Sequence, residues 1–207
     1  AQDAALPQRI SSDKAKPPSE TKHGAAAAAP RFHLPGPWYQ HVAVILLLTI
    51  LTGALYWGDL QLGFFHLDDD SYVIRNPWIR DVTFDKFWHI LTVPYFANYT
   101  PMHNISYMVD FAINGLNAEV FHWSSNIWGG MGAGMVYLLA LALTSNRPAA
   151  VAAGLLFVAH PSHVEAVAWI SSRKDLVALT FALPALLTWL LYLDESRNRK
   201  LWYTVSV

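Results

Sequence analysis

The 207-residue sequence contains no cysteine, and only 14% of its residues carry a charge. The absence of cysteine excludes disulfide bonds and thiolate metal sites. The formal net charge is −1, so the composition does not indicate the basic surface that binds nucleic acid. Hydrophobic residues, in contrast, make up 54% of the chain and occur in long blocks. We therefore expect a membrane protein with no nucleic-acid partner.

The first 37 residues lack any apolar periodicity and are rich in Ala, Pro, Ser and Lys. A segment of this composition does not bury enough apolar surface to fold alone, and we expect residues 1–37 to form a flexible cytoplasmic tail. The tail does not resemble a signal peptide, because no short apolar core follows a basic start.

Four apolar blocks follow the tail. The first, residues 38–57, has no internal charge, has the length needed to cross a bilayer and is bracketed by aromatic residues. The second, at about 123–143, contains the segment GGMGAG, whose small residues allow another helix to approach closely. The third runs from 148 to about 160, where Pro161 predicts a break, and the fourth covers 176–193.

The segment between the first two blocks, residues 58–118, is polar and contains two amphipathic stretches. Thr83 is a predicted N-cap of the first, whose apolar face comprises Phe84, Phe87, Trp88 and Leu91. The second begins at Pro101 and ends at Gly115, with an apolar stripe of Met102, Ile105, Met108, Val109 and Ala112. We expect an outer-face loop that lies on the membrane or packs as a small subdomain.

The predicted fold class is thus an all-α integral membrane protein with four transmembrane helices and an amphipathic-helical outer loop. Transmembrane helices 2 to 4 occupy residues 119–193, and residues 194–207 hold a cytoplasmic loop and the start of a further apolar segment. Basic residues occur before the first span, between the second and third, and after the fourth: Lys14, Lys16, Lys22, Arg31, Arg147, Arg197, Arg199 and Lys200. The positive-inside rule places these segments in the cytoplasm and the 58–118 loop outside.

Three adjacent carboxylates, Asp68, Asp69 and Asp70, stand just after the first span. Crowded carboxylates raise the pKa of one another, and a positioned carboxylate can act as a general base. We expect no cofactor, although the three residues could instead hold a divalent cation through oxygen ligands. The plain alternative is a solvated loop.

A second polar cluster lies on the same predicted outer face and comprises His160, His163, Glu165, Arg173, Lys174 and Asp175. Histidine and glutamate can transfer protons, and Arg173 and Lys174 can hold a phosphate. His160 and His163 are separated by Pro161 and do not form the helical i,i+4 pair of a zinc site, so no metal site is predicted. The alternative is an interfacial turn with no chemistry.

Two histidines, His41 and His122, lie near the ends of the first and second spans. Either could ligate a haem or a chlorin. A single histidine in a membrane helix is more often hydrogen-bonded to another helix, which is the simpler reading.

Three stretches of the sequence resemble a known family: LDDDSYVIRNPWI, YTPMHNISYMVDFAINGLNAEVFHW and GLLFVAHPSHVEAVAWISSRKDLVAL. They resemble the N-terminal membrane part of bacterial multispanning proteins with C-terminal tetratricopeptide repeats. These proteins are similar to the transmembrane-and-tetratricopeptide O-mannosyltransferases of animals. The resemblance covers about residues 58–193.

The resemblance implies a GT-C membrane fold in the bacterial inner membrane, with the 58–118 loop in the periplasm. In that family a polyprenyl-phosphate sugar donor reacts at the outer face, and the acidic motif of the first loop holds the catalytic acidic residue. Carried over, the catalytic positions are Asp68 to Asp70. The segment 160–175 would line the same substrate-binding cavity.

Two functions remain open at this point. The family has many more spans than the four seen here, so we expect these 207 residues to be inactive alone. We favour a non-catalytic accessory subunit of a larger membrane complex, in which the tail, the 58–118 loop and the Gly-rich second span contact other membrane subunits. The alternative is the N-terminal part of a polyprenyl-phosphate-sugar-dependent protein O-glycosyltransferase.

Overall fold

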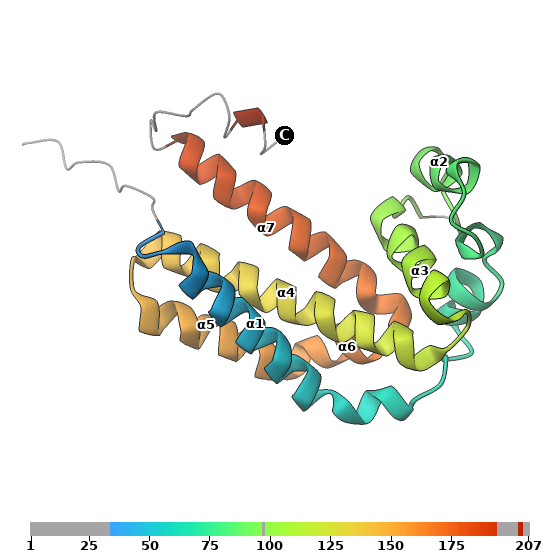
Figure 1. Cartoon of the computed structure of the whole chain (residues 1–207), viewed down its shortest axis with the longest axis horizontal. Coiled ribbons are helices and arrows are strands. Elements are labelled where there is room, and N and C mark those ends of the chain that lie inside the picture. The colour runs from blue at the N-terminus through green and yellow to red at the C-terminus, as the bar shows by residue number, and fades with distance from the viewer. Residues whose placement is uncertain (1–33, 97, 194–202, 205–207) are drawn as a thin grey trace, which may run out of the picture. The chain divides into compact units, whose positions relative to one another are not determined.

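A computed structural model describes residues 34–96, 98–193 and 203–204, and the regular elements of these residues are all helices (Figure 1). The predicted all-α membrane architecture is confirmed. The predictions for the tail fall almost entirely on residues 1–33, outside the described residues, and most of 194–207 lies outside them too.

Three helical segments are long and apolar enough to cross a membrane. They are α1 (Trp38–Leu55), α4 (Ala118–Thr144) and the segment Ile170–Leu193, which contains α7 (Arg173–Leu193). A fourth crossing is formed if α5 (Arg147–Ala159) is counted together with the segment Pro161–Ala168, which is bent by 53° from it. The break predicted at the proline is therefore present, and short helices η4 (Pro161–His163) and α6 (Val164–Ala168) follow it.

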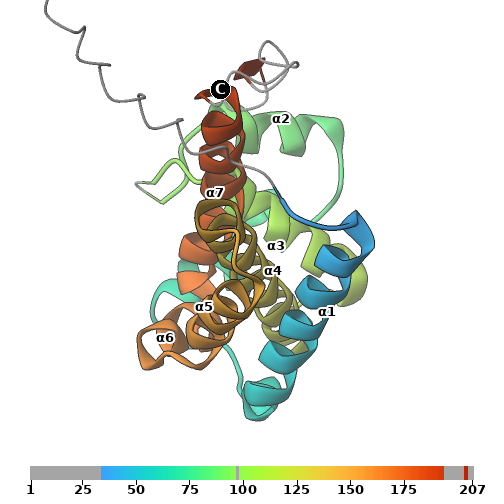
Figure 2. The ribbon, with the colours of Figure 1, turned by 90° about the vertical axis from the view of Figure 1, so that its left-hand side faces the viewer.

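Helix α4 lies at the centre of the bundle and packs against α1, α5 and α7 (Figure 2). Its glycines make this packing close, because a Cβ atom on Gly130 would lie 2.4 Å from Cα of Thr49 on α1. A Cβ atom on Gly134 would similarly meet Ile45 at 2.8 Å. The glycines of the second span thus pack against helices of the same chain. The predicted contact of this span with another subunit stays a prediction.

Two contacts join the start of α1 to the end of the bundle at which α4 is followed by α5. Arg147 donates a hydrogen bond to the carbonyl of Pro35 (2.9 Å), and His41 Nδ1 lies 2.9 Å from the Tyr137 hydroxyl. The start of α1 and the α4–α5 connection therefore share an end, as the charge pattern predicted. His41 is hydrogen-bonded to another helix, which supports the simpler of its two readings.

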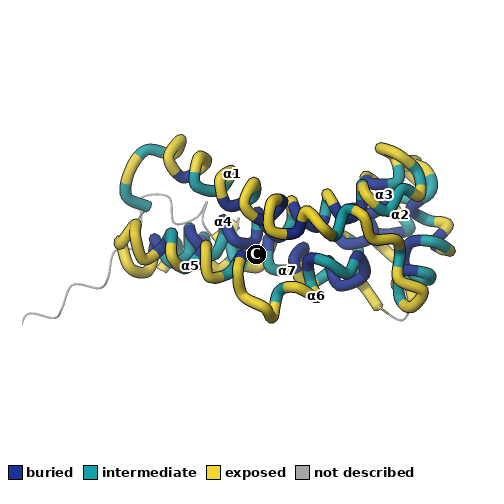
Figure 3. The backbone as a smooth tube through the Cα atoms, turned by 90° about the horizontal axis from the view of Figure 1, so that it is seen from below, coloured by how far each residue is buried: buried dark blue, intermediate teal, exposed yellow. Residues whose placement is uncertain are grey.

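The outward side of α1 stays largely exposed along the helix (Figure 3). Its exposed side chains are mostly apolar and include Leu46, Leu47, Ile50 and Leu55. Apolar surface of this extent on a span-length helix is suited to the hydrocarbon core of a bilayer.

The outer loop consists of short helices and two longer ones. The short ones are η1 (Trp57–Gln61), the π-helical turn η2 (Asp70–Ile74) and η3 (Pro77–Ile79); the longer ones are α2 (Phe84–Thr92) and α3 (Pro101–Asn114). Thr83 caps α2 by accepting a hydrogen bond from the Lys86 amide, as predicted. The loop shares a hydrophobic core with the spans, in which Tyr72, Ile79 and Tyr107 pack with Phe121 and Ile170. It is therefore a subdomain packed on the bundle.

The predicted face of α3 is wrong in part. Met102 and Val109 belong to the predicted apolar stripe, yet they are 43% and 53% exposed, whereas His103, Ser106 and Asp110 are buried. The physical reason is a buried cation, described below, that the polar face of α3 neutralises. Met108 of the stripe is buried in the hydrophobic core, whereas the exposed Met102 and Val109 are available to contact lipid or a ligand.

Candidate functional site

Asp69 is the fully buried member of the aspartate triplet and joins the outer loop to the segment before α7. Its Oδ2 accepts a hydrogen bond from the Phe65 amide (2.9 Å). Its Oδ1 accepts one from the Ser171 amide (2.9 Å) and one from the Ser171 hydroxyl. Ser171 lies in the short helix η5 (Ile170–Ser172). Asp69 thus joins the acidic loop to the segment 160–175 through Ser171, which is not one of the six residues of the second predicted cluster.

Asp70 is the positioned and accessible member of the triplet. Its carboxylate accepts a hydrogen bond from Arg75 (2.9 Å) and one from His66 Nδ1 (3.1 Å), while 22% of its side chain stays exposed. The hydrogen bonds from His66 and then Arg75 lower the pKa of Asp70. Asp68 is partly exposed and forms no hydrogen bond or ion pair with any described residue.

Arg173 forms a buried junction between three helices. Its guanidinium is fully buried and pairs with Asp110 of α3. It also donates to the Ser125 hydroxyl (3.0 Å) and to the Phe121 carbonyl, both on α4, and lies 4.8 Å from the centre of the Tyr107 ring. This satisfied arginine does not present its charge to a phosphate, and the structure gives it a positioning role instead.

Lys174 and Asp175, the next two residues of α7, differ from Arg173. Asp175 is exposed, and Lys174 is partly exposed and lines a cavity of about 270 Å³ between α3 and α7. We call this hollow the α3–α7 cavity; its lining includes Thr100, Met102, His103, Lys174, Val177 and Phe181. Of the six residues of the second predicted cluster, Lys174 is thus the cation that faces an open space.

The other members of that cluster lie elsewhere. His160 and His163 are at the bend between α5 and α6, with ring centres 5.8 Å apart, and Glu165 is exposed. His160 Nδ1 bonds locally to the Ser162 hydroxyl (2.7 Å). Within the described ranges no hydrogen bond or ion pair joins these side chains to the three aspartates, so the structure does not assemble the full predicted site.

Metal binding has little geometric support in the described part of the chain, where no three His, Asp or Glu side chains are grouped to hold an ion. Both oxygens of Asp69 already accept protein hydrogen bonds. The divalent-cation alternative at Asp68 to Asp70 stays a prediction.

Sequence reasoning missed the polar groups of the buried junction, which are His103, Ser106, Asp110 and Ser125. One signal could have revealed them. Residues 103, 106 and 110 recur at the spacing of one helix face, and Asp110 interrupts an otherwise apolar stretch. An isolated carboxylate in an apolar stretch is usually paired with a buried cation.

Comparison with known proteins reveals relatives among the protein O-mannosyl-transferases. Over 155 residues, the chain is 30% identical to protein O-mannosyl-transferase TMTC2 of Mus musculus, an alignment that covers 70% of this chain and 18% of the relative. It is 32% identical to Tmtc2 of Drosophila melanogaster over 160 residues, covering 72% of this chain and 16% of the relative. No family model and no solved structure matches the chain.

The chain spans less than one fifth of the length of these curated relatives. None of the comparisons supports a non-catalytic accessory subunit. The apolar helices and the relatives agree on a multi-pass membrane protein. The chain is therefore a homologue of part of the transmembrane-and-tetratricopeptide O-mannosyl-transferases.

Proposed function

We propose that the chain is the N-terminal membrane part of a protein O-glycosyltransferase of the GT-C type that uses a polyprenyl-phosphate sugar. The observation that carries this proposal is its similarity to protein O-mannosyl-transferases over some 70% of its residues. The bilayer supplies the medium in which such a lipid-linked donor dissolves, and the span-length helices place the chain there.

The reaction needs a base close to the membrane surface. The acceptor hydroxyl oxygen attacks the anomeric carbon of the sugar, the bond from that carbon to the phosphate oxygen breaks, and the polyprenyl phosphate leaves. Asp70 takes the hydroxyl proton, because it is held in place by Arg75 and His66 and remains accessible. Its lowered pKa keeps it ionised at neutral pH.

Asp69 has a different task in this proposal. It is buried and accepts hydrogen bonds on both oxygens, so a substrate cannot reach it. It holds the acidic loop against the start of α7, which fixes where its neighbour Asp70 points.

The proposed orientation follows the basic residues. Arg147 lies at the same end as the start of α1, and we place this end in the cytoplasm of a bacterial inner membrane. The aspartates, at the opposite ends of the spans, then face the periplasm.

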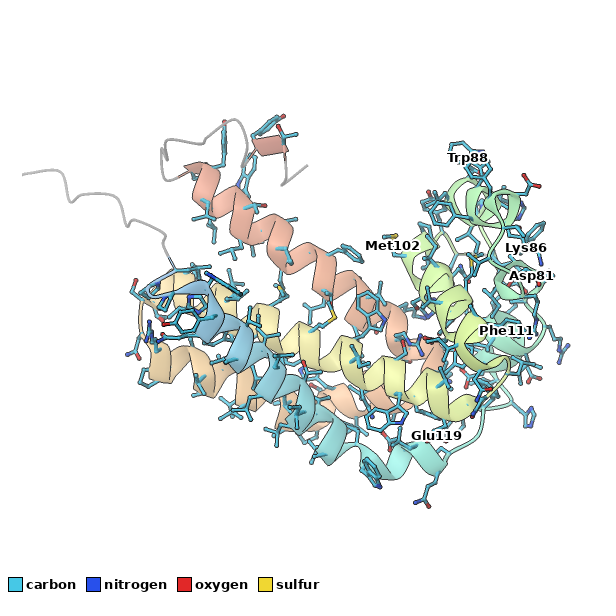
Figure 4. The ribbon with its side chains drawn as sticks, viewed as in Figure 1. Asp81, Lys86, Trp88, Met102, Phe111 and Glu119 are labelled. Carbon is cyan, nitrogen blue, oxygen red and sulfur yellow. The ribbon has the colours of Figure 1, made fainter. Side chains whose placement is uncertain are left out.

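The test is sugar transfer by the full-length natural polypeptide in proteoliposomes, with a labelled lipid-linked sugar and acceptor peptides. We expect Asp70→Asn to lower the transfer rate about 10²–10⁴-fold, the usual contribution of a general base. Asp81→Asn is the matched control, because Asp81 lies in the same loop and is exposed, paired with Lys86 (Figure 4).

Two results would contradict the proposal. Unchanged transfer by Asp70→Asn would remove this carboxylate from the chemistry. No transfer by the unsubstituted protein with any lipid-linked donor, together with stoichiometric co-purifying subunits, would favour the accessory subunit instead.

A further inference from the structure

The α3–α7 cavity combines an apolar wall with unpaired polar groups. Met102 of α3 faces it from one side (Figure 4), and Val177 and Phe181 of α7 face it from the other. A second hollow of about 170 Å³ shares Met102 and Phe181 and extends the apolar wall to Trp128. The polar groups of the α3–α7 cavity lie where α3 and α7 begin, which gives it a polar head. The adjoining hollow is mostly apolar, although Ser106, Asp110 and Ser124 also line it.

Lys174 supplies the positive charge of the polar head. It is partly exposed and forms no ion pair or hydrogen bond with the residues that the structure describes. It stands in the first turn of α7 next to Arg173, where the helix dipole disfavours cations. A lysine in this position is unfavourable for the helix, and a bound anion would offset the cost.

His103 and Thr100 add neutral donors to the same space. His103 is 2% exposed and lines the cavity, and neither of its ring nitrogens has a hydrogen-bond partner among the residues that the structure describes. Burial, followed by the charges of Arg173 and Lys174, holds the pKa of His103 well below its usual value, so the ring is neutral and has one N–H to donate. The Thr100 hydroxyl is also buried, has no hydrogen-bond partner in the described part of the chain and does not cap α3.

The start of α3 completes the polar head. The first amides of a helix have no partner within the helix, and here no side chain of the N-cap residue accepts from them. A helix of 14 residues also presents the positive end of its dipole at this point. Backbone amides, a hydroxyl, a neutral imidazole and an ammonium group together suit a phosphate.

We propose that the α3–α7 cavity binds the phosphate headgroup of an anionic lipid, with Lys174, Thr100 and His103 as its polar contacts. The hydrocarbon chain lies along Met102 and Phe181 toward Trp128. An amphiphile fits better than free phosphate, because the polar head opens onto apolar wall. This inference rests on the proposed function, in which the donor is a lipid phosphate, and it assigns the contacts of that phosphate.

The experiment measures binding and not transfer. The full-length natural polypeptide in detergent micelles is titrated with decaprenyl phosphate, with decaprenol and with inorganic phosphate, and binding is followed by native mass spectrometry. We expect decaprenyl phosphate to bind and Lys174→Gln to weaken it about ten- to a hundredfold, while Lys174→Arg retains most of the affinity. Lys86→Gln is the matched control, since Lys86 is a loop cation paired with Asp81.

A thermal unfolding scan of each variant shows that it is folded. Equal binding of decaprenyl phosphate by Lys174→Gln would overturn the inference. Equal affinity for decaprenol would show that the α3–α7 cavity recognises only the hydrocarbon chain. Equal affinity for inorganic phosphate would show that it binds the free ion. Either outcome overturns the inference.

The two proposals can fail separately. A protein that binds decaprenyl phosphate through Lys174 but transfers no sugar retains this inference and loses the proposed function. A protein that transfers sugar while Lys174→Gln binds the lipid normally retains the function and loses the inference.

Discussion

The buried guanidinium of Arg173 connects α7 to α3 and α4. It neutralises Asp110, bonds to Ser125 and to the Phe121 carbonyl, and lies over the Tyr107 ring. Desolvating such a charge is costly, and the site compensates with partners on every side. Arg173 therefore acts by holding α3, α4 and α7 together.

Removing one partner of this pair is expected to be severe. Arg173→Met leaves the Asp110 carboxylate buried without a cation and should lower the free energy of unfolding by about 3–5 kcal/mol. The double variant Arg173→Met with Asp110→Leu removes both charges and should recover much of this loss. Chemical unfolding in detergent measures both, and an Arg173→Met variant as stable as the natural protein would contradict the junction.

At the scale of helices, the contact between α1 and α4 is set by glycine. Gly130→Ala places a methyl group 2.4 Å from Cα of Thr49, which only a backbone shift can relieve. We expect a loss of about 1–3 kcal/mol in unfolding free energy from this overpacking. Gly58→Ala is the control, because a Cβ atom there would meet nothing within 4 Å. Equal melting temperatures for the two variants would refute a close α1–α4 contact.

Helix α3 shows which part of an element can be predicted. Its start at Pro101 and its end before Gly115 follow from local backbone chemistry and are confirmed. Its inward face is not predictable from apolar spacing, because an apolar stripe at a membrane surface can face lipid or ligand while the polar stripe packs inward. His103, Ser106 and Asp110 recur with the same helical period as the apolar stripe, but these polar residues form the buried face of α3.

At the scale of the whole molecule, the orientation in the membrane can be tested directly because the chain has no cysteine. Single cysteines are introduced at Val82 in the outer loop and at Thr144 at the opposite end, both exposed positions. A membrane-impermeant maleimide added to intact cells should label Val82→Cys and leave Thr144→Cys unlabelled. The reverse labelling would place the aspartates in the cytoplasm and remove the proposed periplasmic site.

The arrangement of the spans around the site is the part of the whole molecule that the sequence does not predict. The distribution of basic residues predicts that the 58–118 loop and the segment 160–175 share one face of the membrane, and the structure adds the contact between Asp69 and Ser171. The distribution of basic residues does not say which spans are neighbours. The sequence therefore groups His160 and His163 with Arg173, whereas the structure places these histidines at the bend after α5.

The ion pair between Arg173 and Asp110 joins residues 63 positions apart, and the aspartate comes first in the chain. During synthesis, α3 therefore emerges well before α7, and the counter-charge for Arg173 already exists when the last described span begins to insert. Because Asp110 pairs with the first residue of α7, this earlier carboxylate fixes the start of that helix against α3.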